Sequence, residues 1–245
     1  MASKRFKGKT CAYCGEVGAS TTGDHVFARQ FFLVTHRANL PEVPACDRCN
    51  SDKSRLESYL LQIMPLGANH ADAQEASRTL MPKRAAHPAN KVLRDIIERP
   101  HETVWLTDQD GKRQERIPVY VDANMLHDWC GLVARGLAFH HWGVATPDYQ
   151  VEAIPLAAEV EHDILAFASR LKGGEYVERS VDNGAFAYRG FRCADGEPAS
   201  MWMIYLYGRM PIGGDPAVSP VCAASVGVFT RPPTQLSSTA DLGAA

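Results

Sequence analysis

Apolar positions along the chain recur first at helical spacing and later at strand spacing, which outlines a mixed fold. Apolar residues between positions 56 and 63 recur every three or four residues and predict a helix over 50–64. Pro65 and Gly67 follow this segment and are expected to end the helix. Two short extended pieces, 21–27 and 42–45, are expected before it.

The remainder of the chain predicts a helical connector followed by strands and two more helices. Connector helices are expected at 70–80 and 88–98, with prolines at positions 88 and 100 interrupting the stretch. Further helices are expected at 123–141 and 158–171. Strand-like runs follow the alternating pattern of half-buried strands at 104–107, 116–121, 176–181, 185–193, 201–207 and 223–229.

These elements predict the α+β fold class. We expect a small N-terminal module at 1–65, a helical connector at 66–100 and an α+β domain of unknown role at 101–230. Residues 231–245 are rich in small and polar residues after two prolines, and we expect a disordered tail there.

Composition changes this outline in two ways. Hydrophobic residues make up 45% and charged residues 22%, as in soluble globular proteins, and no apolar run approaches the ~18 residues of a membrane span. With no signal-like apolar segment, the expected compartment is the cytoplasm. Positive side chains exceed negative ones by five in residues 1–100, whereas negative ones exceed by seven in the rest. This asymmetry suits a polyanion contact near the N-terminus, although ordinary surface scatter would also produce it.

Four of the seven cysteines form two Cys-x-x-Cys pairs, Cys11 with Cys14 and Cys46 with Cys49, separated by 31 residues. Each such turn presents two thiolates to one ion, and two pairs complete the tetrahedron that zinc prefers. Gly15 permits the tight turn after the first pair. The sequence therefore predicts a structural zinc site, and because four cysteines leave no open position, any catalytic groups must lie elsewhere.

Further motifs surround the cysteines. Gly-Asp24-His25-Val-Phe lies between the pairs, Asn39-Leu follows it, and Asn50-Ser-Asp-Lys53-Ser follows the second pair directly. In this order, the motifs of residues 11–58 resemble the HNH nuclease family with zinc knuckles, whose fold is the ββα-metal arrangement. The resemblance covers under a quarter of the chain.

The resemblance implies a metal-dependent endonuclease that hydrolyses phosphodiester bonds in DNA. By position, His25 would be the general base that activates water, and Asp24 and Asn50 would hold a divalent Mg²⁺ or Mn²⁺. Asn39 would orient His25 by a hydrogen bond. This agrees with the chemistry, because histidine accepts a proton near neutral pH and hard oxygen ligands suit magnesium or manganese.

Arg29 and Lys53 are expected to contact phosphates. Taken singly, each of these residues also has an ordinary interpretation: an Asp-His surface turn, an Asn helix cap or a solvated charge. A non-catalytic zinc-knuckle module that binds nucleic acid or protein therefore stays open, as do an RNA substrate and a homodimer.

Two features of the second part favour structural roles. His140 and His141 end a predicted helix, and no cysteine or carboxylate lies at a matching spacing to complete a metal site. The bulky run at 201–207 predicts a core strand, with a base-stacking surface as the alternative.

Overall fold

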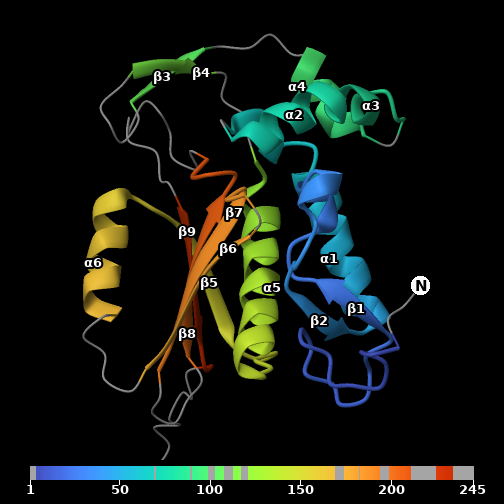
Figure 1. The fold of residues 1–245 in the computed structure, drawn as a ribbon, viewed down its shortest axis with the longest axis vertical. Coiled ribbons are helices and arrows are strands. Elements are labelled where there is room, and N and C mark those ends of the chain that lie inside the picture. The colour runs from blue at the N-terminus through green and yellow to red at the C-terminus, as the bar shows by residue number, and fades with distance from the viewer. Residues whose placement is uncertain are drawn as a thin grey trace, which may run out of the picture.

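The computed structural model describes residues 4–68, 70–88, 90–98, 103–107, 113–116, 121–168, 174–181, 183–193, 199–210 and 225–233. It confirms the predicted α+β class. A small hairpin and helix, a helical segment, a long central helix and a five-stranded sheet follow one another along the chain (Figure 1).

The N-terminal part contains a two-stranded antiparallel sheet and one helix. Strand β1 (Thr22–His25) pairs with β2 (Glu42–Ala45), and α1 (Asp47–Leu60) follows β2 at once. Two 3-10 turns, η1 (Arg29–Phe31) and η2 (Val34–His36), lie between the strands. The predicted helix therefore begins three residues early, because the second cysteine pair forms its first turn, and it ends at Leu60, before the 3-10 turn η3 (Met64–Gly67).

The middle of the chain is helical, as predicted, and ends in a short hairpin. Its elements are α2 (Ala71–Thr79), α3 (Met81–Ala85), α4 (Lys91–Glu98), β3 (Val104–Thr107) and β4 (Arg113–Arg116). Strand β4 begins before the strand expected at 116–121, of which 117–120 lie outside the described residues.

The C-terminal part is an antiparallel sheet between two helices. Its strands, in the order β5-β9-β8-β7-β6, are β5 (Gln150–Leu156), β6 (Glu175–Val181), β7 (Phe186–Arg192), β8 (Ser200–Leu206) and β9 (Ser225–Arg231). Helix α5 (Ala123–Trp142) lies between this sheet and the N-terminal part, and α6 (Ala158–Ala168) covers the opposite face (Figure 1). Strand β5 was not predicted.

One hydrophobic core joins the N-terminal part to α5 and the sheet. Phe27 and Phe31 follow β1, and both rings contact Phe186 of β7 at centroid distances of 5.4 Å. The Phe31 ring also meets Trp129 of α5 edge-on at 5.6 Å. Because these residues belong to one buried cluster, the predicted module and the predicted C-terminal domain share a core. The exact domain boundaries stay a prediction.

Helix α5 has defined ends. Asp122 caps it by accepting hydrogen bonds from the backbone N–H groups of Asn124 and Met125, and Gly143 adopts the left-handed conformation (φ 66°) after its last turn. The Tyr59 hydroxyl of α1 accepts from the Asp122 backbone N–H at 2.8 Å, which ties the start of α5 to α1.

The last strand of the sheet reaches into the predicted C-terminal tail. Of the tail predicted at 231–245, Arg231 is the last residue of β9, and 234–245 lie outside the described residues. Within the described part of the chain, no helix has both the length and the apolar surface needed to cross a bilayer.

Candidate metal centre and Asp24–His25 site

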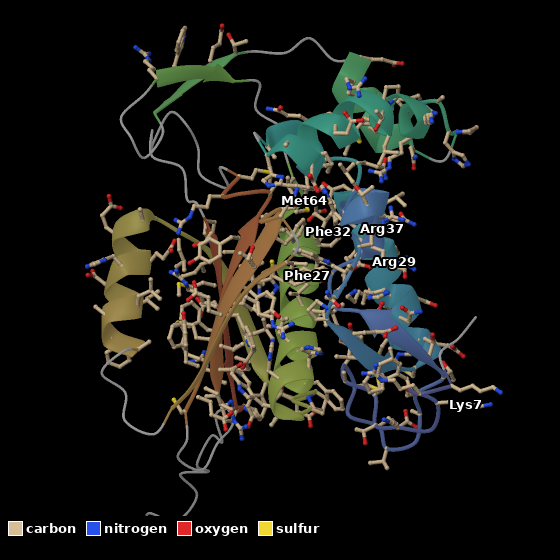
Figure 2. All side chains as sticks on the ribbon, in the orientation of Figure 1. Lys7, Phe27, Arg29, Phe32, Arg37 and Met64 are labelled. Atoms are coloured by element: carbon tan, nitrogen blue, oxygen red, sulfur yellow. The ribbon has the colours of Figure 1, made fainter. Side chains whose placement is uncertain are left out.

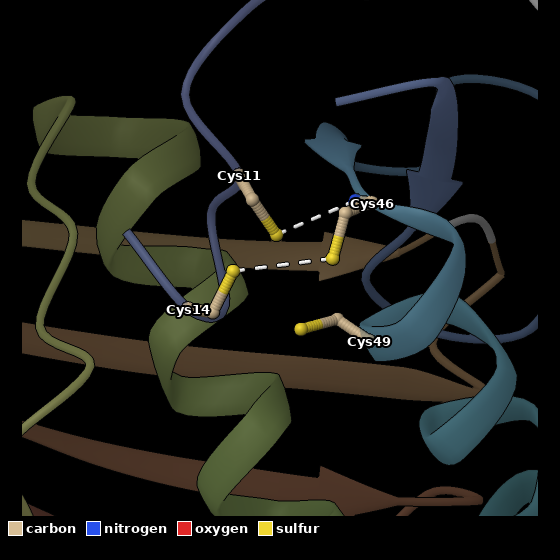
Figure 3. A group of neighbouring side chains, drawn as sticks. All are labelled: Cys11, Cys14, Cys46 and Cys49. Atoms are coloured by element: carbon tan, nitrogen blue, oxygen red, sulfur yellow. Dashed lines mark hydrogen bonds between the residues drawn. The ribbon is translucent and has the colours of Figure 1, made fainter. Parts of the chain in front are cut away.

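The four paired cysteines converge on one point (Figure 3). Their sulfur atoms all lie within 4.8 Å of one another, and the Sγ atoms of Cys14 and Cys46 are 3.9 Å apart. In a tetrahedral zinc site with metal–sulfur bonds of about 2.3 Å, the sulfur–sulfur edges are about 3.8 Å. The cluster can therefore hold a metal ion such as zinc with little movement.

Backbone geometry prepares both cysteine pairs. Gly15 adopts a positive φ (70°), and its N–H donates to the Cys11 carbonyl at 2.9 Å, which closes the first knuckle. The Cys46 N–H points at the Cys11 sulfur at 3.4 Å. Burial tends to raise the pKa of Cys11, but backbone N–H groups, including that of Cys46, outweigh it and lower the pKa. These donors favour a thiolate, the form that binds a metal.

A buried lysine organises the segment between the cysteine pairs. Lys53 of α1 is fully buried, and its Nζ donates to the His25 carbonyl at 2.8 Å and to Glu57 Oε1 at 2.5 Å and forms an ion pair with Asp24 Oδ2 at 3.1 Å. Two of the three N–H donors of the ammonium are thus used in hydrogen bonds, and the Asp24 and Glu57 carboxylates face its charge. The prediction that Lys53 contacts a phosphate is therefore wrong in this structure, because the side chain points inward to join α1 to the end of β1.

Asp24 lies against α1 with only part of its carboxylate accessible. Its Oδ2 accepts from the Tyr13 hydroxyl at 2.5 Å and forms an ion pair with Lys53, and its side chain is 12% exposed. Oδ1 accepts no hydrogen bond from the described residues and is the oxygen left for a cation. Glu57 balances part of the lysine charge, so the Asp24–Lys53–Glu57 group carries a net negative charge when both carboxylates are ionised.

His25 is half-buried at the end of β1. Burial lowers its pKa; the Glu42 carboxylate opposes this effect, and the charges of Arg29 and Lys53 add to it. The imidazole is therefore neutral at neutral pH, which is the form that accepts a proton. Its Nδ1 is buried and has no partner among the described residues.

The structure does not supply the predicted Asn39 contact. Asn39 is exposed in a left-handed turn (φ 57°), a conformation that asparagine tolerates better than most residues, and it makes no described hydrogen bond to His25. Its position indicates a turn role.

Asn50 lies in the first turn of α1, where its N–H donates to the Cys46 carbonyl at 3.0 Å. Because residues three apart share a helix face, Asn50 and Lys53 lie on the same side of α1. Lys53 contacts Asp24, so Asn50 and Asp24 come from facing elements. Within the described residues, the four cysteines are the only cluster of three or more His, Cys, Asp or Glu with metal-ligand geometry. A cation between Asp24 and Asn50 would thus have few protein ligands, as magnesium often does.

Three residues of this site were not identified from the sequence: Tyr13, Glu57 and Trp129. Tyr13 and Glu57 bind Asp24 and Lys53, and the Trp129 indole N–H approaches Glu57 Oε1 at 3.5 Å. The four-residue spacing of Lys53 and Glu57 on a predicted helix was an available signal. No sequence signal pointed to Trp129, which lies 72 residues beyond Glu57.

No protein-family model, curated protein or solved structure matches this chain.

Proposed function

We propose that this chain is a metal-dependent endonuclease of the HNH type that hydrolyses phosphodiester bonds in DNA. The observation that carries the proposal is the position of Lys53, whose Nζ binds both the Asp24 carboxylate and the His25 carbonyl. These contacts tie the Asp24 carboxylate and the backbone of His25 to the helix whose first turn carries Asn50. Rigid positioning of acid–base groups is what hydrolytic catalysis requires.

Each residue has a distinct role in the proposal. His25, neutral near pH 7, takes the proton from the attacking water. Asp24 Oδ1 and the Asn50 amide oxygen bind a divalent cation, Mg²⁺ or Mn²⁺, which would neutralise charge on the scissile phosphate. Lys53 is a positioning residue that does not touch the substrate. Arg29, exposed after β1, contacts a neighbouring phosphate.

We further propose that the ion held by Cys11, Cys14, Cys46 and Cys49 is zinc and that its role is structural. Four cysteine ligands close the coordination shell, so no water can be activated there. The first knuckle carries Tyr13, which binds Asp24, and the second opens α1, which carries Lys53 and Asn50. The zinc would therefore stabilise the same elements that hold the proposed catalytic groups.

One observation favours a second candidate, a non-catalytic zinc-knuckle module that binds nucleic acid or protein. Asp24 Oδ2 is held by a hydrogen bond from Tyr13 and an ion pair with Lys53, as expected for a carboxylate that only stabilises the fold. In that case the Asp-His pair would hold α1 in place without binding a cation.

A plasmid-nicking assay with the full chain separates the two candidates. Under the first, supercoiled DNA is nicked with Mg²⁺ or Mn²⁺ and not in EDTA, and His25→Ala lowers the rate by at least about 100-fold, the usual contribution of a general base. His162→Ala is the matched control, because His162 is exposed on α6, across the sheet from the site. Equal nicking by wild type and His25→Ala would refute the catalytic assignment. Parallel reactions with labelled single-stranded DNA and RNA test whether RNA is the substrate.

A further inference from the structure

Three arginines around the η1 segment have no acidic partner among the described residues. Arg29 opens η1, Arg37 follows η2 and Arg84 lies on α3; we call them the arginine cluster. Within the described residues, none of the three makes an ion pair with a carboxylate. Arg78, by contrast, forms a bidentate pair with the Glu75 carboxylate at 2.7–3.1 Å.

Backbone carbonyls hold two of these guanidinium groups in place. Arg37 Nε donates to the Phe32 carbonyl at 3.1 Å. Arg84 donates from Nη1 to the Leu61 carbonyl at 2.8 Å and from Nη2 to the Gln30 carbonyl at 3.4 Å. Both arginines are thus anchored around the η1 segment that begins with Arg29. Carbonyls are neutral, so they orient these side chains and leave their charge uncompensated.

The three charges lie near one another, and Arg29 lies near His25. Burial lowers the pKa of Arg37, and the charge of Arg29 lowers it further. Burial also lowers the pKa of Arg84; Tyr207 opposes this effect, and the charge of Arg37 adds to it. The charge of Arg29 also lowers the pKa of His25. Figure 2 labels Arg29 and Arg37 next to each other beside the upper part of α1, whereas Phe27 and Phe32 are labelled nearer to α5.

We infer that the arginine cluster binds the phosphate backbone of a nucleic acid that passes His25 and continues over η1 toward α3. Guanidinium groups bind phosphates with charge-assisted, often bidentate, hydrogen bonds. Three cationic groups contributed by three separate segments suit a chain of phosphates better than a single small anion. The inference rests on the proposed function in that the strand would be the substrate of His25, and it adds Arg37 and Arg84 to the contact surface.

Fluorescence anisotropy with a labelled DNA duplex and no added divalent cation tests binding separately from cleavage. Each lost phosphate contact reduces the slope of log K against log salt concentration by about 0.9 and weakens binding by roughly tenfold near 0.1 M salt. Arg29→Ala/Arg37→Ala should therefore lower the slope by about 1.8. Arg78→Ala, the paired and exposed arginine of α2, should bind like wild type. Arg84→Gln, which keeps hydrogen-bond donors, should lower the slope by about 0.9.

Four results would overturn the inference. The first two are no DNA binding by wild type and an unchanged salt slope in the double variant. The other two are a loss of DNA affinity in Arg78→Ala equal to that in the double variant, and binding to phosphatidylserine vesicles that depends on the same arginines as strongly as DNA binding does. The test is also independent of catalysis. A protein that binds DNA through the cluster but never nicks it would refute the proposed function alone, whereas nicking with an unchanged salt slope in the double variant would refute the inference alone.

Discussion

Replacing Lys53 by methionine tests the buried charge network on which the site depends. The substitution keeps an unbranched side chain of similar length and removes the only cation that contacts Asp24 and Glu57 in the described part of the chain. Lys53 is fully buried, and the two carboxylate side chains are 12% and 7% exposed, so solvent replaces only a small part of the lost interaction. Removing one partner of a buried ion pair costs about 3–5 kcal/mol.

For a chain of this size, such a loss corresponds to a melting temperature lower by roughly 6–20 °C. Circular dichroism melts and urea titrations of the zinc-loaded protein measure it. Arg55→Met is the matched control, because Arg55 is exposed on the same helix and should change the stability by no more than about 0.5 kcal/mol.

A double-mutant cycle identifies the cause. Glu57→Gln removes one of the two stranded charges, so Lys53→Met/Glu57→Gln should be more stable than the sum of the single effects predicts. The stability deficit of Lys53→Met should also shrink as the pH falls. Burial already raises the pKa of Glu57 against the lowering effect of Lys53; without the lysine this pKa rises further, and protonation at low pH relieves the penalty. A deficit under 1 kcal/mol, or additive effects in the cycle, would refute this account of the network.

Three further predictions concern other parts of the molecule. Cys46→Ser should lower the zinc content below one ion per chain and reduce the melting temperature, whereas Cys193→Ser, at an isolated exposed cysteine, should change neither; metal analysis and melting curves check this. Gly190→Ala should destabilise the protein by about 1–3 kcal/mol in urea titrations, because the added Cβ would overlap the Trp202 ring on the neighbouring strand. Burial lowers the pKa of His141 to about 4, so the unfolded chain takes up this proton at a higher pH than the folded chain does. The free energy of unfolding should therefore fall as the pH drops from about 6.5 toward 4. His141→Gln should flatten this pH dependence in melting curves across that range, and an unchanged slope would contradict the prediction.

Much of the fold was predictable because local sequence patterns determine where its helices and strands form. The strand expected at 42–45 matches β2, and the helix expected at 123–141 matches α5 to within one residue, since a capping Asp122 and a terminal Gly143 bracket an apolar pattern. Strand β5 was missed because Pro155 interrupts its pattern. Proline is tolerated there because β5 is an edge strand, a fact that only the sheet order reveals.

The candidate site was predictable in its ligands but not in its surroundings. Two Cys-x-x-Cys pairs constrain their own geometry, so the four-cysteine cluster followed from spacing. The inward position of Lys53 did not, because a lysine is usually exposed, and its partners Asp24 and Glu57 are themselves bound by Tyr13 and Trp129, which are distant in sequence from Lys53. The shared core of Phe27, Trp129 and Phe186 is likewise a set of long-range contacts that no local pattern encodes.

The two histidines at the end of α5 contact other elements of the fold. His140 Nδ1 lies 3.4 Å from the Glu42 carbonyl, and His141 Nε2 lies 2.9 Å from the Tyr188 hydroxyl. They thus join α5 to β2 and to the sheet. Strand β8, predicted as a core strand, is buried along most of its length and lies in the middle of the sheet.

The account depends most on a cation bound between Asp24 and Asn50 beside His25. Electron paramagnetic resonance of Mn²⁺ titrated into the zinc-loaded protein measures this binding without any turnover. We expect a bound Mn²⁺ site in wild type that is lost or greatly weakened in Asn50→Ala and in Asp24→Asn, with zinc content and circular dichroism unchanged in Asn50→Ala. Mn²⁺ binding of equal strength in wild type and both variants, or none in wild type, would contradict the account.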